Sequence, residues 1–195
     1  MKTKRVNIAI LASGGGSNAQ CILERFENHP TIRVKLVVSN KDQAYVLERA
    51  DNFKISTFVH SKEDAISGKL LSVLKEFGID FIVLAGYLQK IGDDLIESFP
   101  NRIVNIHPAL LPKFGGKGMY GMHVHRAVKA AGETESGPTI HFVNENYDEG
   151  AIIEQHRCSI DENDSPEDIQ KKVLALEHKY FAPCIEKLIT EDYEI

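Results

Sequence analysis

Two polar side chains end an apolar segment near the middle of the chain. Asn105 and His107 lie in the run Ile103-Val104-Asn105-Ile106-His107-Pro108. Side chains alternate along a strand, so residues two apart lie on the same side and both could face one cleft. An amide and an imidazole there can stabilise the negative charge that a carbonyl oxygen gains under nucleophilic attack. The pair predicts chemistry at a carbonyl group, with a strand-end histidine bonded to the main chain as the plainer alternative.

A carboxylate for this histidine could come from the acidic segment Asn144-Glu145-Asn146-Tyr147-Asp148-Glu149-Gly150. A buried carboxylate beside an imidazole favours the charged form and raises the histidine pKa. A solvated hairpin turn rich in Asn, Asp and Gly explains the same residues equally well.

A glycine-rich loop, Ser13-Gly14-Gly15-Gly16-Ser17-Asn18, follows the first apolar run. Glycines before a helix let main-chain N–H groups meet the positive end of the helix dipole, which suits a phosphate. The loop also fits the loose dinucleotide fingerprint, but the second strand ends Ser39-Asn40-Lys41, without the acid that usually binds an NAD ribose. NAD is therefore disfavoured, an NADP-binding module stays open, and a capped tight turn is the structural alternative.

Other chemical signatures are weak. His123 and His125 lack the i, i+4 helical spacing of a zinc pair, so no metal is predicted. His141 could face the cleft from its strand, although a packed, hydrogen-bonded histidine is the default. The chain lacks the GxSxG elbow of hydrolases, and Ser67-Gly68-Lys69-Leu70 lacks the Ser or Thr of a P-loop.

The elements that must position these residues alternate along the chain. Short apolar runs with helical patterns between most of them predict an α/β fold with a mostly parallel central sheet and helices on both faces. Two later runs are joined by only seven residues, too few for a helical crossover, and predict an antiparallel edge pair. The parallel runs are Val6 to Ala12, Ile32 to Ser39, Ile55 to Val59, Phe81 to Ala85 and Ile103 to Ile106, and the pair is Thr139 to Val143 with Ala151 to Ser159.

Helix starts are marked by capping residues at Ser61 and at Ser165, which is followed by a proline. The last helix is expected to run to about Ile189 and to dock through Ile169, Val173, Leu176 and Tyr180, with Glu177 beside that stripe.

Bulk properties narrow the class of protein. The 195 residues, 43% of them hydrophobic, predict one domain over residues 1–195. We expect a monomer or a homodimer. A net charge of −5 and the lack of a long apolar stretch argue against nucleic acid and membrane partners. Three cysteines without CxxC spacing indicate a reducing compartment, and we expect the cytoplasm.

The order of motifs resembles one family. The glycine loop, Ala85-Gly86-Tyr87 after the fourth strand, NIHPALLPKF after the fifth and TIHFVNENYDEG together are similar to the phosphoribosylglycinamide formyltransferases, from about Val6 to Leu188. The resemblance implies a Rossmann-like formyltransferase fold. It also implies transfer of the formyl group of 10-formyltetrahydrofolate, as co-substrate, to the amine of 5-phosphoribosylglycinamide in purine synthesis, without a metal or a covalent enzyme intermediate.

By this resemblance, Asn105, His107 and Asp148 are the catalytic residues, and Gly16, Ser17, Asn18 and Glu177 bind the phosphoribosyl substrate. Asn105 is also implied at the folate. The folate pocket would be lined by Tyr87, Leu88, Gln89, Lys90 and Ile91 and by Asn144, Glu145, Asn146, Tyr147 and Asp148.

Three features depart from the family pattern. Gln89-Lys90 replaces an arginine followed by an apolar residue, no arginine occurs between Phe53 and Pro100, and the loop from Lys113 to His123 is longer and richer in glycine. That loop is a candidate lid over the substrate, or the mark of a branch of the family with another amine acceptor. The alternatives are a formyltetrahydrofolate hydrolase and a methionyl-tRNA formyltransferase with the same core, each of which normally carries an added domain that this chain lacks.

Overall fold

A computed structural model describes residues 5–192 of the chain. The chain divides into two compact units, one formed by the residues up to Ile103 together with those from Ala182, the other by Val104–Phe181.

The first unit is built on four parallel strands in the order β3-β2-β1-β4. The strands begin and end close to the predicted apolar runs, so the parallel α/β prediction is confirmed here. Its elements are β1 (Val6–Leu11), α1 (Ser17–Phe26), β2 (Ile32–Ser39), α2 (Val46–Asn52), β3 (Ser56–Val59), α3 (Lys62–Ile66), α4 (Lys69–Glu76), β4 (Phe81–Leu84), α5 (Asp93–Ser98) and the terminal turn η1 (Leu188–Asp192).

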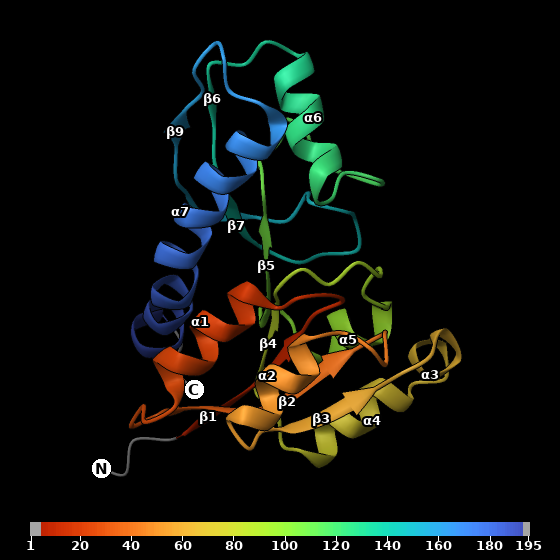
Figure 1. The fold of residues 1–195 in the computed structure, drawn as a ribbon. Helices are drawn as coiled ribbons and strands as arrows, with labels where there is room; N and C mark the ends of the chain where they lie inside the picture. Colours follow the sequence, from red (N-terminus) through yellow and green to blue (C-terminus); the bar gives the residue numbers. More distant parts are fainter. Residues whose placement is uncertain (1–4, 193–195) are drawn as a thin grey trace. The chain divides into compact units, whose positions relative to one another are not determined.

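Burial explains the central strands of this unit. β4 is buried at every position and β1 at all but Asn7, as expected of strands covered on both faces. Helices α1 and α2 pack against each other and against β2 (Figure 1). The predicted capping box is present at α3, where Ser61 Oγ accepts from the Asp64 N–H and the Asp64 carboxylate accepts from the Ser61 N–H.

The second unit contains an antiparallel set in which β7 pairs with both β5 and β8. The predicted antiparallel pair is therefore confirmed, but the run from Ala151 to Ser159 is not one strand. It divides because the His156 N–H turns to the Pro138 carbonyl, after which β9 pairs with β6 in a separate small sheet. The elements are β5 (Ile103–His107), α6 (Met122–Ala130), β6 (Glu135–Ser136), β7 (Thr139–Phe142), β8 (Ile152–Gln155), β9 (Cys158–Ser159) and α7 (Pro166–Lys187). Ile103 of β5 and the residues of α7 from Ala182 are counted in the first unit.

Helix α7 begins as predicted, with Ser165 and Asp168 capping each other across the first turn. Its buried stripe differs from the prediction. Ile169 and Val173 are buried, but the stripe continues through Glu177 and Phe181, while Leu176 and Tyr180 are only partly buried. Steps of four residues turn about 40° each around a helix with 3.6 residues per turn, so the buried stripe winds around α7 and Glu177 lies in it and not beside it.

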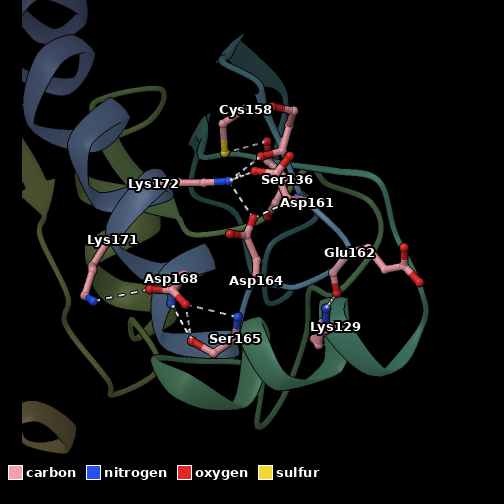
Figure 2. A network of polar contacts seen from close by, with 11 residues as sticks. Lys129, Ser136, Cys158, Asp161, Glu162, Asp164, Ser165, Asp168, Lys171 and Lys172 are labelled. Carbon is pink, nitrogen blue, oxygen red and sulfur yellow. Dashed lines mark hydrogen bonds and ion pairs between the residues drawn. The ribbon is translucent and has the colours of Figure 1, made fainter.

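A polar network ties α7 to the segment before it. Figure 2 shows Lys172 reaching Asp161 and Asp164, with Nζ–O distances of 2.8 Å and 2.5 Å. These carboxylates raise the pKa of Lys172. In the same view Cys158 donates to the main-chain oxygen of Ser136, which links β9 to β6.

Two chemical features of the described chain bear on its class. Cys21, Cys158 and Cys184 form no disulfide bond among the residues that the structure describes. Among residues 5–192, no helix is both long and apolar enough to span a bilayer.

Candidate active site

The predicted polar pair lies at the end of β5, in the second unit. Asn105 stands opposite His141 in the register of β5 with β7, and Asn105 Nδ2 lies 3.1 Å from His141 Nε2. His107, two residues further along β5, lies 3.5 Å from the carboxylate of Asp148 through its Nδ1 atom. The structure therefore brings together all three side chains that the resemblance implied as catalytic, and adds a second histidine to them.

The main chain fixes which nitrogen of His107 carries a proton. Nε2 lies 2.8 Å from the carbonyl oxygen of Phe114, and a carbonyl oxygen can only accept, so Nε2–H is the donor. Nδ1 then faces Asp148 at a distance beyond an ordinary hydrogen bond. Nδ1 is the ring atom available to a reacting group.

The pKa of His107 reflects opposing influences. Burial, with 3% of the residue exposed, is the largest and lowers the pKa below its ordinary value. The Asp148 carboxylate and the Phe114 carbonyl act in the opposite direction, and His141 lowers the pKa further. The carboxylate thus favours the imidazolium as expected, but it does not overcome burial.

Asp148 is held in the left-handed region at φ 57°, a conformation that aspartate tolerates better than most residues. Its Oδ2 accepts from the Gly116 N–H at 2.9 Å, and its Oδ1 lies 3.6 Å from His141 Nε2. Burial acts to raise the Asp148 pKa, but the neighbouring His141, the charge of His107 and the Gly116 N–H outweigh it and the pKa lies below its usual value. Asp148 is therefore an anion at neutral pH.

His141 is more than the packed histidine expected by default. Its Nδ1 donates to the Phe142 carbonyl at 2.9 Å, which leaves the lone pair of Nε2 to accept from the Asn105 amide. This contact orients the amide of Asn105. The sequence carried one signal of this role, because His141 alternates with apolar residues in a strand that the antiparallel pairing brings beside β5.

The glycine-rich loop from Lys113 to His123 contributes main-chain groups to the site. It supplies the Phe114 carbonyl to His107 and the Gly116 N–H to Asp148. Between them, a Cβ on Gly115 would lie 2.6 Å from the Leu111 side chain and 3.2 Å from the Asp148 Cβ, so a larger residue would displace both side chains. Main-chain groups leave no mark on residue types, and the sequence could not reveal this role.

Helix α6 places another histidine in the second unit. His125 is 2% exposed, and its Nδ1 has no hydrogen-bond partner. Burial, with a smaller contribution from His107, lowers the His125 pKa to about 4. His125 is therefore neutral at physiological pH.

The glycine loop lies in the first unit, between β1 and α1. Gly16 is the N-cap of α1 and caps it without a side chain, and the first turn contains no acidic residue. At φ 68°, a Cβ on Gly16 would lie 2.5 Å from the Val46 side chain, so α2 itself requires this glycine. Gly14 and Gly15 instead border a cavity of about 770 Å³, with open space around both Cα atoms.

The predicted folate segments lie in different units. In the first, Tyr87 donates from its hydroxyl to His60 Nε2 at 2.9 Å and the Leu88 N–H donates to Ser13 Oγ at 2.9 Å. Leu88 is exposed, and Ile91 is buried. In the second, the side chain of Asn144 accepts from the Asn146 N–H in an Asx turn, and Tyr147 is exposed. Glu177 is buried in α7.

A family model described as formyl transferase matches residues 6–185, across both units. The chain belongs to the formyl transferase family. Within this family it is 43% identical to a chloroplastic phosphoribosylglycinamide formyltransferase of Arabidopsis thaliana, an alignment that covers 96% of this chain and 67% of that protein. It is 37% identical to the Bacillus subtilis phosphoribosylglycinamide formyltransferase, over 93% of both chains.

Solved structures of the formyl transferase family agree with the fold. A phosphoribosylglycinamide formyltransferase from Bacillus halodurans matches with a TM-score of 0.86 at 35% identity, over 97% of this chain and 98% of that one. The predicted α/β fold, mostly parallel with antiparallel pairs, is confirmed by this similarity.

Proposed function

We propose that the chain transfers the formyl group of 10-formyltetrahydrofolate to the amine of 5-phosphoribosylglycinamide. The observation that carries the proposal is the convergence of Asn105, His107 and Asp148, in a chain whose relatives are named for this reaction. Asn105 and His107 can donate hydrogen bonds to an oxyanion. The Asp148 carboxylate can balance the positive charge of a protonated His107.

In the proposed reaction, the amine nitrogen attacks the formyl carbon and the carbonyl electron pair moves onto oxygen. Asn105 donates one amide hydrogen to His141 and has a second for this oxyanion. His107 donates from Nδ1, because Nε2 is bonded to Phe114. Asp148 compensates the imidazolium charge.

Collapse of the tetrahedral adduct breaks the bond between the formyl carbon and N10 of the folate. The attacking nitrogen loses one proton and N10 gains one, so the transfer is balanced. Because Nδ1 of the imidazolium already carries a proton, water takes the proton from the amine and delivers it to N10.

We place the substrate phosphate on the loop from Gly14 to Asn18. Support comes from the glycine N-cap and the acid-free first turn of α1, which leave its N–H groups and dipole for an anion. We assign the folate to residues 87–91 and 144–148, and the ribose to Glu177, as the family resemblance implies. The three cysteines, which form no disulfide bond in the described part of the chain, suit a reducing compartment, and we propose the cytoplasm.

The decisive experiment for the reaction measures tetrahydrofolate release from 10-formyltetrahydrofolate, with and without 5-phosphoribosylglycinamide. We expect release to depend on the phosphoribosyl substrate and to yield its formylated product. Equal release with water alone would identify a hydrolase and refute the proposal.

The phosphate placement is tested by Ser17→Asp, with Ser17→Asn as the uncharged control. A carboxylate in the first turn of α1 stabilises the helix by its dipole, so the melting temperature should hold or rise. The same charge repels a phosphate, and KM for 5-phosphoribosylglycinamide should rise about tenfold or more. An unchanged KM would move the phosphate elsewhere.

A further inference from the structure

Helix α2 contacts Gly14, Gly15 and Gly16 of the loop between β1 and α1, each in a different way. The Val46 N–H donates to the Gly14 carbonyl at 3.1 Å, and the Val46 side chain fills the space against Gly16. One turn later, Arg49 Nε donates to the Gly15 carbonyl at 2.7 Å.

These contacts set the direction of two peptide units. In a trans peptide, the carbonyl and the N–H of the same unit point in opposite directions. Because the carbonyls of Gly14 and Gly15 point to α2, the N–H groups of Gly15 and Gly16 point away from it. Successive N–H groups turned to one side form an anion-binding concavity, which here continues into the uncapped N-terminus of α1.

Arg49 is itself held in place. Its Nη1 donates to the Gln20 side chain at 3.0 Å, and its guanidinium lies over the Tyr45 ring, 4.9 Å from the centroid. Gln20 belongs to α1 and Tyr45 precedes α2, so the guanidinium joins the two helices at the loop. A planar group that makes two directed bonds fixes a carbonyl more firmly than a flexible ammonium.

We infer that Arg49 is a positioning residue for phosphate binding: it holds the Gly15 carbonyl toward α2 so that the loop presents its N–H groups to the phosphate. The inference rests on the proposed phosphate placement. Arg49 acts through the main chain of the loop, and its effect should appear in binding of the phosphorylated substrate and not in the chemical step.

The test compares Arg49→Met, which keeps an unbranched stem, with Arg49→Lys, which keeps the charge and can make only one of the two directed bonds. Arg25→Met is the matched control, because Arg25 is a partly exposed arginine of α1 that pairs with Glu186. For each protein, KM and kcat are measured with 5-phosphoribosylglycinamide, together with KM for 10-formyltetrahydrofolate and inhibition by ribose 5-phosphate.

We expect Arg49→Met to raise KM for 5-phosphoribosylglycinamide about tenfold, the usual effect of losing a hydrogen bond to a charged group. Inhibition by ribose 5-phosphate should weaken in parallel, with kcat and the folate KM within about twofold of the parent. The KM of Arg49→Lys for 5-phosphoribosylglycinamide should lie between those of the parent and Arg49→Met. The KM of Arg25→Met should equal that of the parent.

Three results would overturn the inference. One is an unchanged KM in both Arg49 variants while Ser17→Asp raises it, which keeps the phosphate on the loop but removes Arg49. Another is full rescue by Arg49→Lys, which makes the effect one of charge alone. If Ser17→Asp and both Arg49 variants leave KM and inhibition unchanged, the phosphate placement itself falls. If Arg49→Met does not fold, Arg49→Lys is the test. A KM above the parent value then supports the inference, and a KM equal to the parent value contradicts it.

Discussion

His107 Nε2 donates to the carbonyl oxygen of Phe114 at 2.8 Å, and this bond determines which face of the imidazole serves the reaction. With Nε2 occupied, only Nδ1 is directed toward Asp148 and a reacting group. The long loop therefore shapes the catalytic histidine through its main chain. The consequences can be measured at each partner of the histidine.

Asp148→Asn should lower the pKa of His107, because the carboxylate opposes the effect of burial and a neutral amide does not. Activity should fall most at pH values above the new pKa, where the imidazolium is depleted, and recover in part at lower pH while the substrate amine stays unprotonated. NMR titration of His107 in both proteins measures the shift. An unchanged pKa with lost activity would make Asp148 a positioning or proton-relay residue.

His141→Leu removes the acceptor that orients the Asn105 amide. We expect kcat to fall about tenfold, since a misdirected amide loses part of its bond to the oxyanion, with little change in either KM. His123→Leu is the control, because His123 is exposed on α6. Parent-like kcat in His141→Leu would show that Asn105 needs no such support.

Gly115→Ala places a methyl group 3.2 Å from the Asp148 Cβ and 2.6 Å from Leu111. Asp148 must give by a few tenths of an ångström, and we expect the displaced carboxylate to lower kcat about tenfold. Thermal unfolding of the same protein separates this effect from general destabilisation. Unaltered kcat would mean that the loop yields without moving Asp148.

Stability should depend on pH through His125. Its pKa is about 4 in the folded chain, below the ordinary value of 6.5, so the unfolded chain binds more protons between these values. The stabilisation is complete above pH 6.5 and is lost as pH falls toward 4. Between pH 7.5 and 5 the loss is about 2 kcal/mol.

Denaturant unfolding of the parent and of His125→Leu at both pH values measures that loss. The variant should lose about 2 kcal/mol less than the parent over the same interval, because a leucine does not titrate. Equal losses in the two proteins would assign the acid sensitivity to other groups.

The sequence predicts the fold well where periodicity carries the information. Continuous apolar runs such as Phe81–Leu84 can only be buried strands, and the short connection after Phe142 permits only antiparallel pairing. The prediction of the buried face of α7 is wrong, because the residue that continues this face is Glu177. A charged residue is not expected on an apolar helix face.

The site also contains groups that the sequence predicts and groups that it does not. Asn105, His107 and Asp148 are recognisable because their side chains carry the chemistry. The Phe114 carbonyl, the Gly116 N–H and the Gly15 carbonyl have no residue-type signature, since every residue supplies the same main-chain groups. Arg49 acts on such a group, so only the folded arrangement reveals it, whereas the alternation of His141 with apolar residues along its strand gave one signal in the sequence.

The central claim is that Asn105 and His107 stabilise one oxyanion during formyl transfer. The most direct measurement is kcat for formation of formylated 5-phosphoribosylglycinamide by the parent, by His107→Ala and by Asn105→Ala, each shown to be folded. We predict losses of about 10²-fold or more in each variant, with KM values largely retained. Near-parental turnover in folded His107→Ala would contradict the account and leave the histidine a structural residue at the end of β5.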